Sequence, residues 1–220
     1  MKKKLVFSAA AGALFLLLIL ALRTVDVSAI GPAGTKVGLS KLNEAFHSLT
    51  GTHFFLYDLT EWLGIAAIFV AVCFALLGLT QLIQRRSLLQ VDKSILALGG
   101  LYVALAVLYV FFEKFIVNYR PVVMPGDAAP EASFPSSHTM LFCGILGSAA
   151  LVAGKYVKAF DTRRILQGVC WVLVGAAVIC RLLSGVHWLT DIIGGVLISA
   201  ALLGIFSVIL DKLQGASAAP

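Results

Sequence analysis

Six long apolar runs, separated by short polar breaks, constrain this chain more than any other feature of its sequence. The runs are Leu5–Leu22, Trp62–Ile83, Ser94–Phe112, Met140–Val152, Ile165–Ile179 and Ile192–Leu210. A membrane-spanning helix needs about 20 mostly apolar residues. The fourth and fifth runs reach that length when their flanks are included, the fourth from near Ser136. The sequence therefore predicts an all-α, polytopic membrane protein with six transmembrane helices.

The composition agrees with this prediction and limits the number of domains. Of the 220 residues, 60% are hydrophobic and 13% are charged, whereas soluble domains carry about 25% charged residues. A soluble enzyme and a disordered regulator are therefore poor fits. Six spans use roughly 120 residues, so we expect short loops and a single membrane-embedded domain over residues 1–220.

The first apolar run has two interpretations. Three lysines precede it and Val27-Ser28-Ala29 follows it, a pattern that resembles a secretory signal peptide with a small-residue cleavage site. The run is longer than the roughly 7–15 apolar residues of a usual signal peptide. We favour a retained membrane helix, with cleavage within residues 1–29 as the alternative.

The basic residues are distributed unequally between the two sides of the predicted membrane domain. Most of them fall in the two terminal tails and in the second and fourth breaks: Lys2, Lys3, Lys4, Arg85, Arg86, Lys93, Lys155, Lys158, Arg163, Arg164 and Lys212. Because cytoplasmic loops are enriched in Lys and Arg, we predict a cell-membrane protein with both termini in the cytoplasm. The net charge of +6 is then mostly a topology signal, and we expect no nucleic-acid partner.

The first outward loop, Arg23–Glu61, is the longest. Leu39, Leu42, Phe46 and Leu49 recur in it at helical spacing, which predicts a short amphipathic helix. We interpret this segment as a helix that lies on the bilayer surface. A cap over a lateral entrance from the bilayer is the alternative.

Ionisable residues at the ends of membrane helices are functional candidates because their burial is costly, and three clusters of them lie on the outward side. The first cluster contains Lys114, Arg120 and Pro121, after the third run. Two neighbouring cations suit an anion, since Arg matches phosphate oxygens with a planar fork and Lys offers a point charge. A pair of cations that reach to the membrane surface is the alternative interpretation.

The second cluster is Pro135-Ser136-Ser137-His138, at the start of the fourth helix. Pro and Ser are favoured at helix N-termini, where unpaired N–H groups form an anion site. His138 adds a titratable donor next to these groups. The alternative is a plain Ser cap followed by an interfacial His.

The third cluster contains Arg181, His187 and Asp191, between the fifth and sixth runs. His187 and Asp191 are four residues apart, so on a helix they would share a face. A carboxylate on one imidazole nitrogen sets the tautomer and leaves the other nitrogen free to act as a base or nucleophile. A simple capping pair is the alternative, but three such clusters on one side of the membrane favour a joint site.

Together the three clusters resemble the signature of the type 2 phosphatidic acid phosphatase superfamily. That signature is Lys, a spacer and Arg-Pro, then Pro-Ser-Gly-His, then Ser-Arg, five residues, His, three residues and Asp. The third part matches from Arg181 through His187 to Asp191, and the second part matches at all positions except one. The motifs lie within residues 114–191, and the six-helix frame extends the resemblance over most of the chain.

The chain departs from this signature at three places. The spacer between Lys114 and Arg120 has five residues instead of six, which turns Lys114 by about 100° if the segment is helical. Glu113 occupies the position where the Lys of the family would fall. Ser137 replaces the Gly of the second motif, and Cys180 replaces the Ser before Arg181.

The resemblance implies a metal-free hydrolase that acts on a lipid phosphate or diphosphate through a phosphohistidine, at the extracytoplasmic face. It implies that His187 is the nucleophile, that Asp191 orients it and that His138 is the general acid and base. The residues implied to hold the phosphoryl oxygens are Lys114, Arg120, Pro121, Ser136, Ser137 and Arg181. No cofactor is implied, and the oligomeric state stays open. A lipid phosphotransferase with the same site, or a non-catalytic membrane transporter or scaffold, is the alternative function.

Overall fold

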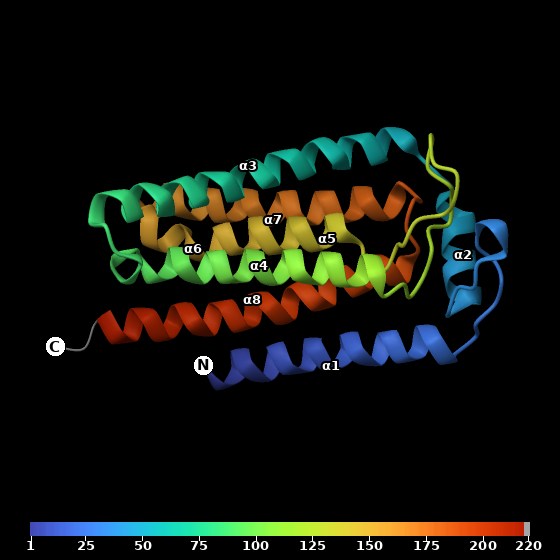
Figure 1. Cartoon of the computed structure of the whole chain (residues 1–220), viewed down its shortest axis with the longest axis horizontal. Helices are drawn as coiled ribbons and strands as arrows, with labels where there is room; N and C mark the ends of the chain where they lie inside the picture. Colours follow the sequence, from blue (N-terminus) through green and yellow to red (C-terminus); the bar gives the residue numbers. More distant parts are fainter. Residues whose placement is uncertain (218–220) are drawn as a thin grey trace.

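The structure, a computed structural model, describes residues 1–217, which form a bundle of long helices with one short helix across its end (Figure 1). The helices are α1 (Lys2–Thr24), α2 (Ser40–Thr50), α3 (Phe54–Arg85), α4 (Lys93–Lys114), α5 (Ser137–Leu141), α6 (Gly147–Tyr156), α7 (Phe160–Leu183) and α8 (Leu189–Ser217), with short 3-10 helices at Pro32–Gly34 and Leu88–Gln90. Within the described residues, six helical stretches are long and apolar enough to cross a membrane. The predicted all-α architecture with six transmembrane helices is confirmed.

The fourth span is the most buried of the six. It runs from Ser137 to Tyr156 through α5, a π-helical stretch at Phe142–Leu146 and α6. Of the residues in its most apolar 18-residue stretch, 67% are buried, against 11–44% for the same length of the other five spans. The start of α5 therefore lies in the interior of the bundle, and with it His138.

The second span begins earlier than the apolar run predicts. The sequence places its start near Trp62, but α3 begins at Phe54 and contains Thr60 and Glu61. The helix continues through these polar residues because both of them contact a buried guanidinium in the interior of the bundle. Glu61 therefore lies inside a membrane helix, with its carboxylate beside His138.

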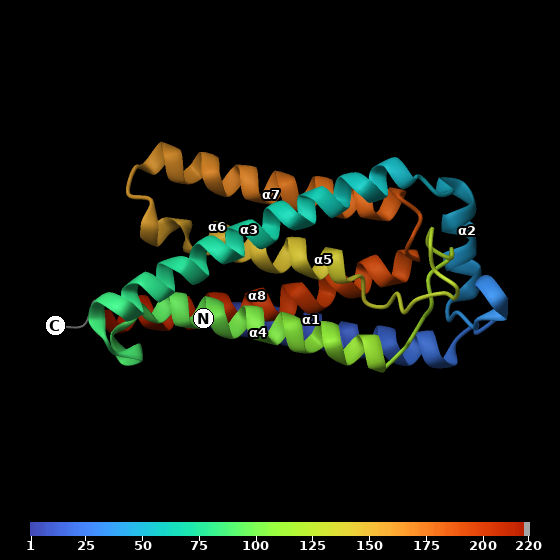
Figure 2. The ribbon, with the colours of Figure 1, turned by 45° about the horizontal axis from the view of Figure 1, so that its top comes forward.

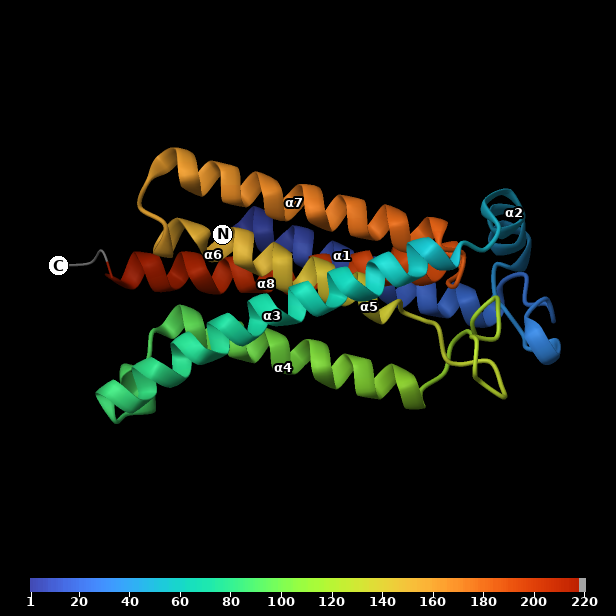
Figure 3. The same ribbon diagram turned by 90° about the horizontal axis from the view of Figure 1, so that it is seen from above.

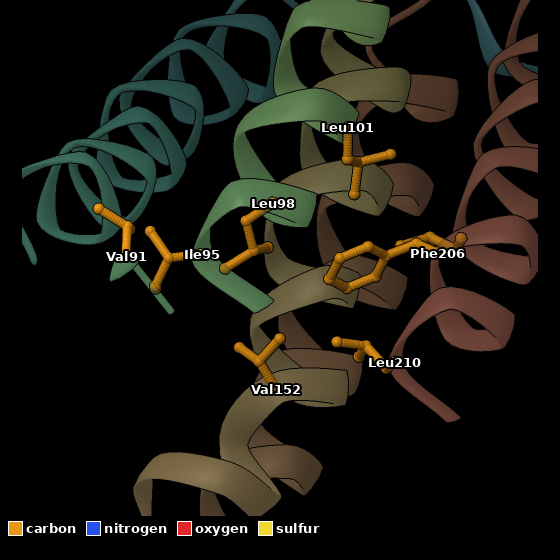
Figure 4. Close-up of a cluster of buried hydrophobic side chains, with 8 residues drawn as sticks. Val91, Ile95, Leu98, Leu101, Val152, Phe206 and Leu210 are labelled. Carbon is orange, nitrogen blue, oxygen red and sulfur yellow. The ribbon is translucent and has the colours of Figure 1, made fainter. Parts of the chain in front are cut away.

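Apolar side chains hold the bundle together at the end that lies away from α2. Leu98 of α4, Val152 of α6 and Phe206 of α8 meet in one buried cluster (Figure 4). Along the outside of the bundle, α1 packs on α8, where the small residues Ser8 and Gly204 allow a close approach: a Cβ on Gly204 would lie 2.9 Å from Cβ of Ser8. Small residues of this kind are typical of helix contacts within membranes.

At the opposite end, the connecting segments gather around the helix termini. Helix α2, the loop between α4 and α5 and the turn between α7 and α8 all lie at this end (Figures 1 and 2). Toward the same end, α3 and α4 diverge, as the view from above shows (Figure 3). All three sequence clusters are therefore at one end of the bundle, the end toward which α3 and α4 diverge (Figures 1 and 3).

Candidate active site

The turn between α7 and α8 brings His187 against Asp191. Gly185 has a φ of +68°, and a Cβ there would lie 1.9 Å from the carbonyl oxygen of Gly51, so only glycine fits this turn. His187 precedes α8, and Asp191 lies in its first turn. The two are therefore not on one helix face, but the turn still places His187 Nδ1 3.7 Å from Asp191 Oδ2.

Asp191 is completely buried, and its carboxylate accepts hydrogen bonds from donors other than His187. Oδ2 accepts from the backbone N–H of Trp188 at 3.0 Å, and Oδ1 accepts from Asn118 Nδ2 at 3.3 Å. The backbone carbonyl of Asp191 also accepts from the N–H of Ser136 at 3.0 Å. The start of α8 is thus connected to the loop after α4 and to the start of α5.

Helix α5 begins as the sequence predicts, with Ser136 as its N-cap. Ser136 Oγ accepts from the N–H and the hydroxyl of Thr139, at 3.4 and 3.0 Å. Ser137 and His138 are the first two helical residues, so their N–H groups are among those that a helix leaves unpaired. Unpaired N–H groups at a helix N-terminus can bind an anion, so the start of α5 is a candidate anion site.

Arg181, in the last turn of α7, brings the second and third clusters together. Its side chain is fully buried. Nη2 lies 3.1 Å from His138 Nδ1 and 3.5 Å from His187 Nε2. The guanidinium also lies over the ring of Tyr57, 4.9 Å from its centroid. One cation therefore contacts both predicted catalytic histidines.

Glu61 belongs to the same constellation, although none of the sequence motifs includes it. Its Oε1 accepts from Arg181 Nη1 at 3.0 Å, and its Oε2 lies 3.2 Å from His138 Nε2. Thr60 Oγ1 accepts from the same Nη1 at 2.9 Å. The signal that could have identified Glu61 is a charged residue at the edge of a long apolar run, which is a functional candidate in a membrane protein.

Arg120 approaches the site from the loop between α4 and α5. Its Nε lies 3.1 Å from Glu131 Oε2, and among the described residues its buried Nη1 has no hydrogen-bond partner. Together with Ser133, Ser137 and His187 it lines a small cavity of about 20 Å³. Arg120 is therefore available to a further anion beside the predicted nucleophile.

The remaining members of the first cluster lie further out. Lys114 is exposed at the end of α4, whereas its neighbour Glu113 lines the small cavity. This is the rotation that the five-residue spacer implies, so a role for Lys114 in phosphate binding stays a prediction. Pro121 is half-buried directly after Arg120.

The surroundings of His187 favour its neutral form. Burial lowers the pKa of His187 well below its usual range, and the positive charges of Arg181 and Arg120 act in the same direction. Arg donates hydrogen bonds and accepts none. The contact from Arg181 Nη2 to His187 Nε2 therefore places the lone pair on Nε2 and the proton on Nδ1, beside Asp191.

Two buried asparagines support this arrangement, and the motifs include neither of them. Asn118 connects the N–H of Gly38, at 3.4 Å, to the carboxylate of Asp191. Asn43 of α2 accepts from the N–H of Thr190 at 3.2 Å and donates to its hydroxyl at 3.0 Å. The predicted amphipathic helix in the first outward loop is thus confirmed as α2, and it contacts the protein through Asn43 at the start of α8.

Comparisons with known proteins place the chain in a family. The model of the PAP2 superfamily matches residues 100–214, which is more than half of the chain. The fold is similar to a crystal structure described as the first transmembrane PAP2-type phosphatidylglycerolphosphate phosphatase from Bacillus subtilis, with a TM-score of 0.62, 19% sequence identity and 96% of each chain covered. No curated protein matches the sequence. The protein, whose His187, Asp191, His138, Arg120 and Arg181 all lie within the matched residues, belongs to the PAP2 superfamily.

Proposed function

We propose that this protein is an integral membrane phosphatase that hydrolyses a lipid phosphate or diphosphate through a phosphohistidine, without a metal ion. The observation that carries the proposal is the approach of two histidines, from different helices, to the single buried guanidinium of Arg181. A cation between two imidazoles is a natural place for a phosphoryl group that one imidazole attacks and the other protonates.

His187 is the nucleophile in this proposal. Its Nε2 lone pair forms a bond to phosphorus while the bond between phosphorus and the leaving oxygen breaks. Asp191, beside Nδ1, orients the ring and stabilises the positive charge that the imidazole acquires. The neutral form that the low pKa of His187 favours is the form that can attack.

His138 supplies the proton for the leaving oxygen. In the free enzyme Arg181 donates to Nδ1, so the proton of the neutral ring is on Nε2. When the substrate binds and Arg181 turns to the phosphoryl oxygens, Nδ1 takes up a second proton from solvent, and the resulting imidazolium gives its Nε2 proton to the leaving oxygen and becomes neutral. After the first step, Nε2 takes a proton from a water molecule, which attacks the phosphohistidine. The bond between phosphorus and His187 then breaks, and inorganic phosphate leaves from a monophosphate substrate or from the end of a diphosphate.

The cations and helix N–H groups hold the phosphoryl oxygens. Arg181 and Arg120 take this role together with the N-terminus of α5 at Ser136, Ser137 and His138, and Pro121 and Lys114 complete the proposed binding set. Phosphoryl transfer depends mainly on positioning and charge stabilisation, and this arrangement supplies both.

An apolar groove beside His138 supports a lipid substrate. Its volume is about 400 Å³, and it lies between α3, α4 and α5, with Ile68, Tyr102 and Leu105 among its lining residues. It lies between the two helices that diverge in Figure 3. A lipid tail in this groove would place its headgroup at His138 while the lipid stays in the bilayer.

The distribution of basic residues supports an orientation with the site outside the cytoplasm. Helix α2 and the loops of the site lie at one end of the bundle, and the start of α1 and the end of α8 lie toward the other (Figure 1). In the proposed orientation both termini are cytoplasmic, and the phosphatase acts on lipids of the outer leaflet of the cell membrane.

The decisive experiment measures phosphate release by the purified protein in detergent, with phosphatidate, phosphatidylglycerophosphate and undecaprenyl diphosphate as substrates. His187→Ala should abolish release from whichever lipid the wild-type protein hydrolyses, because it removes the attacking atom. His53→Ala, which changes an exposed histidine at the same end of the bundle, is the matched control and should retain activity. Normal turnover by His187→Ala, or a strict requirement for magnesium after treatment with a chelator, would contradict the proposal.

A further inference from the structure

Glu61 occupies a position that the proposed chemistry requires for the substrate. Its two carboxylate oxygens contact two different groups of the site: Oε1 lies 3.0 Å from Arg181 Nη1, and Oε2 lies 3.2 Å from His138 Nε2. The first group must bind a phosphoryl oxygen and the second must protonate the leaving oxygen. A phosphate ester would present its own oxygens to the same two groups.

The hydrogen bonds of His138 show that Glu61 and the substrate would use the same ring nitrogen. Because Nδ1 of His138 accepts from Arg181, Nε2 carries the proton and donates it to the Glu61 carboxylate. The leaving oxygen of the substrate needs a donor at this same nitrogen. A carboxylate and a phosphoryl group are both acceptors for Arg and His donors, so Glu61 and the substrate compete for one set of donors.

The surroundings of Glu61 place it at the headgroup end of the apolar groove. Glu61, Gly64, Ile68 and Ala71 follow one another at helical spacing along one face of α3, and Ile68 and Ala71 line the groove beside His138. A Cβ on Gly64 would lie 3.1 Å from Cδ2 of the His138 ring. A lipid tail that lies along this face would therefore carry its phosphate to the position of Glu61.

We propose that Glu61 is a specificity-determining residue, an internal anion that holds the phosphate site of the free enzyme and that the lipid phosphate displaces. This inference rests on the proposed function. An ionised Glu61 cannot remain next to a bound phosphate without strong repulsion, since neither charge is fully screened there. Its side chain is 36% exposed, which leaves room for it to turn away from Arg181.

The competition sets how tightly the site binds any phosphate. A headgroup with a doubly charged terminal phosphate displaces Glu61 more readily than a singly charged phosphodiester, because it interacts more strongly with Arg181 and Arg120. The free enzyme is thereby protected from weak anions, and ordinary membrane phosphodiesters are poor competitors for the site.

The test compares Glu61→Gln with Asp58→Asn, which removes the same charge one turn earlier on α3 from an exposed side chain. Inorganic phosphate is the probe, and its inhibition constant and its stabilisation of the protein against heat are measured in detergent. For Glu61→Gln we expect inhibition and stabilisation at about tenfold lower phosphate concentration, a lower KM for the lipid phosphate and a kcat within about threefold of wild type. Asp58→Asn should change neither constant more than about twofold.

A second pair of outcomes for Glu61→Gln would overturn the inference. If Glu61→Gln binds phosphate no more tightly and its kcat falls tenfold or more, Glu61 holds His138 for proton transfer and the inference is overturned. Glu61→Ala should tighten phosphate binding in the same way, which keeps the test decisive if Glu61→Gln folds poorly. Failure of the proposed function would be seen separately, as a wild-type protein that releases no phosphate from any lipid phosphate.

Discussion

At the scale of single residues, the position of His187, the proposed nucleophile, depends on side chains that have no chemical role in the proposed reaction. Asn118 is fully buried and donates to Asp191 Oδ1, while its own oxygen accepts from the N–H of Gly38. Asn118 on Oδ1 and the N–H of Trp188 on Oδ2 together hold the carboxylate in one orientation. Asn118 is therefore a positioning residue for Asp191 and, through it, for His187.

We expect Asn118→Ala to lower kcat by about 10- to 100-fold, the range that corresponds to losing one hydrogen bond to a buried charge. KM should change much less, because Asn118 does not line the apolar groove and its side-chain hydrogen bonds are to Gly38 and Asp191, not to the cations proposed to bind phosphate. Asn118→Asp should be at least as harmful, since it replaces the donor by a second carboxylate. Steady-state kinetics on a lipid phosphate measure both constants, and an unchanged kcat in Asn118→Ala would exclude the positioning role.

The low pKa of His187, caused first by its burial and then by Arg181 and Arg120, predicts how stability depends on pH. In the unfolded chain this histidine takes up a proton below about pH 6.5, whereas in the folded protein it stays neutral. The unfolded state then binds more protons, so stability falls as the pH falls through this region. The contribution of one histidine is at most about 1.4 kcal/mol per pH unit.

Thermal unfolding in detergent at pH 7.5 and at pH 5.5 tests this prediction. The melting temperature of the wild-type protein should fall more between the two values than that of His187→Gln, which has no group to titrate at this position. Equal decreases in the two proteins would show that His187 is not held neutral in the folded state.

At the scale of elements, the first turn of α8 is completed by another helix. A helix leaves its first N–H groups unpaired, and in α8 the N–H of Thr190 donates to Asn43, which comes from α2. Gly195 of α8 lies so close to α5 that a Cβ there would be 2.8 Å from Cβ of Thr139. These two contacts place the starts of α5 and α8, and therefore His138 and His187, side by side.

We expect Asn43→Ala to destabilise the protein by about 1–2 kcal/mol, the usual effect of losing a capping side chain. Activity should fall with it, because the start of α8 carries Asp191. Ser48→Ala is the matched control on the same helix, since within residues 1–217 its exposed hydroxyl bonds only to the carbonyl of Ala45, and it should be nearly neutral. The two melting temperatures provide the comparison, and equal values would show that α2 does not support the site.

At the scale of the whole molecule, the bundle has two chemically different ends. One end carries α2 and the site, and α3 and α4 diverge toward it (Figure 3). The other end carries most of the basic residues and the ion pair of Lys155 with Asp92, which connects the end of α6 to the start of α4. Because cytoplasmic loops are enriched in Lys and Arg, we expect the basic end to face the cytoplasm.

Labelling of single cysteines in intact cells tests this orientation, after Cys73, Cys143, Cys170 and Cys180 have been replaced. Leu49→Cys lies at the site end and Leu89→Cys at the basic end, and the native leucines are 85% and 88% exposed. A membrane-impermeant maleimide should label Leu49→Cys directly and Leu89→Cys only after permeabilisation. The reverse pattern would place the site in the cytoplasm.

The sequence by itself determined the six spans, the presence of α2 and the start of α5 at Ser136. These features depend on local composition, because a bilayer requires long apolar helices and a helix start requires a capping group. The family motifs likewise identified His138, His187 and Arg181, which the structure brings together.

Only the tertiary structure decided how these residues meet and which others join them. His187 reaches Asp191 across a turn and not along a helix. That turn requires glycine at position 185, because the carbonyl oxygen of Gly51, which is far away in the sequence, lies against it. Glu61 and Arg181 are 120 residues apart, and Asn118 and Asp191 are 73 apart. Contacts over such separations arise from the packing of several helices at once, so no local pattern in the sequence records them.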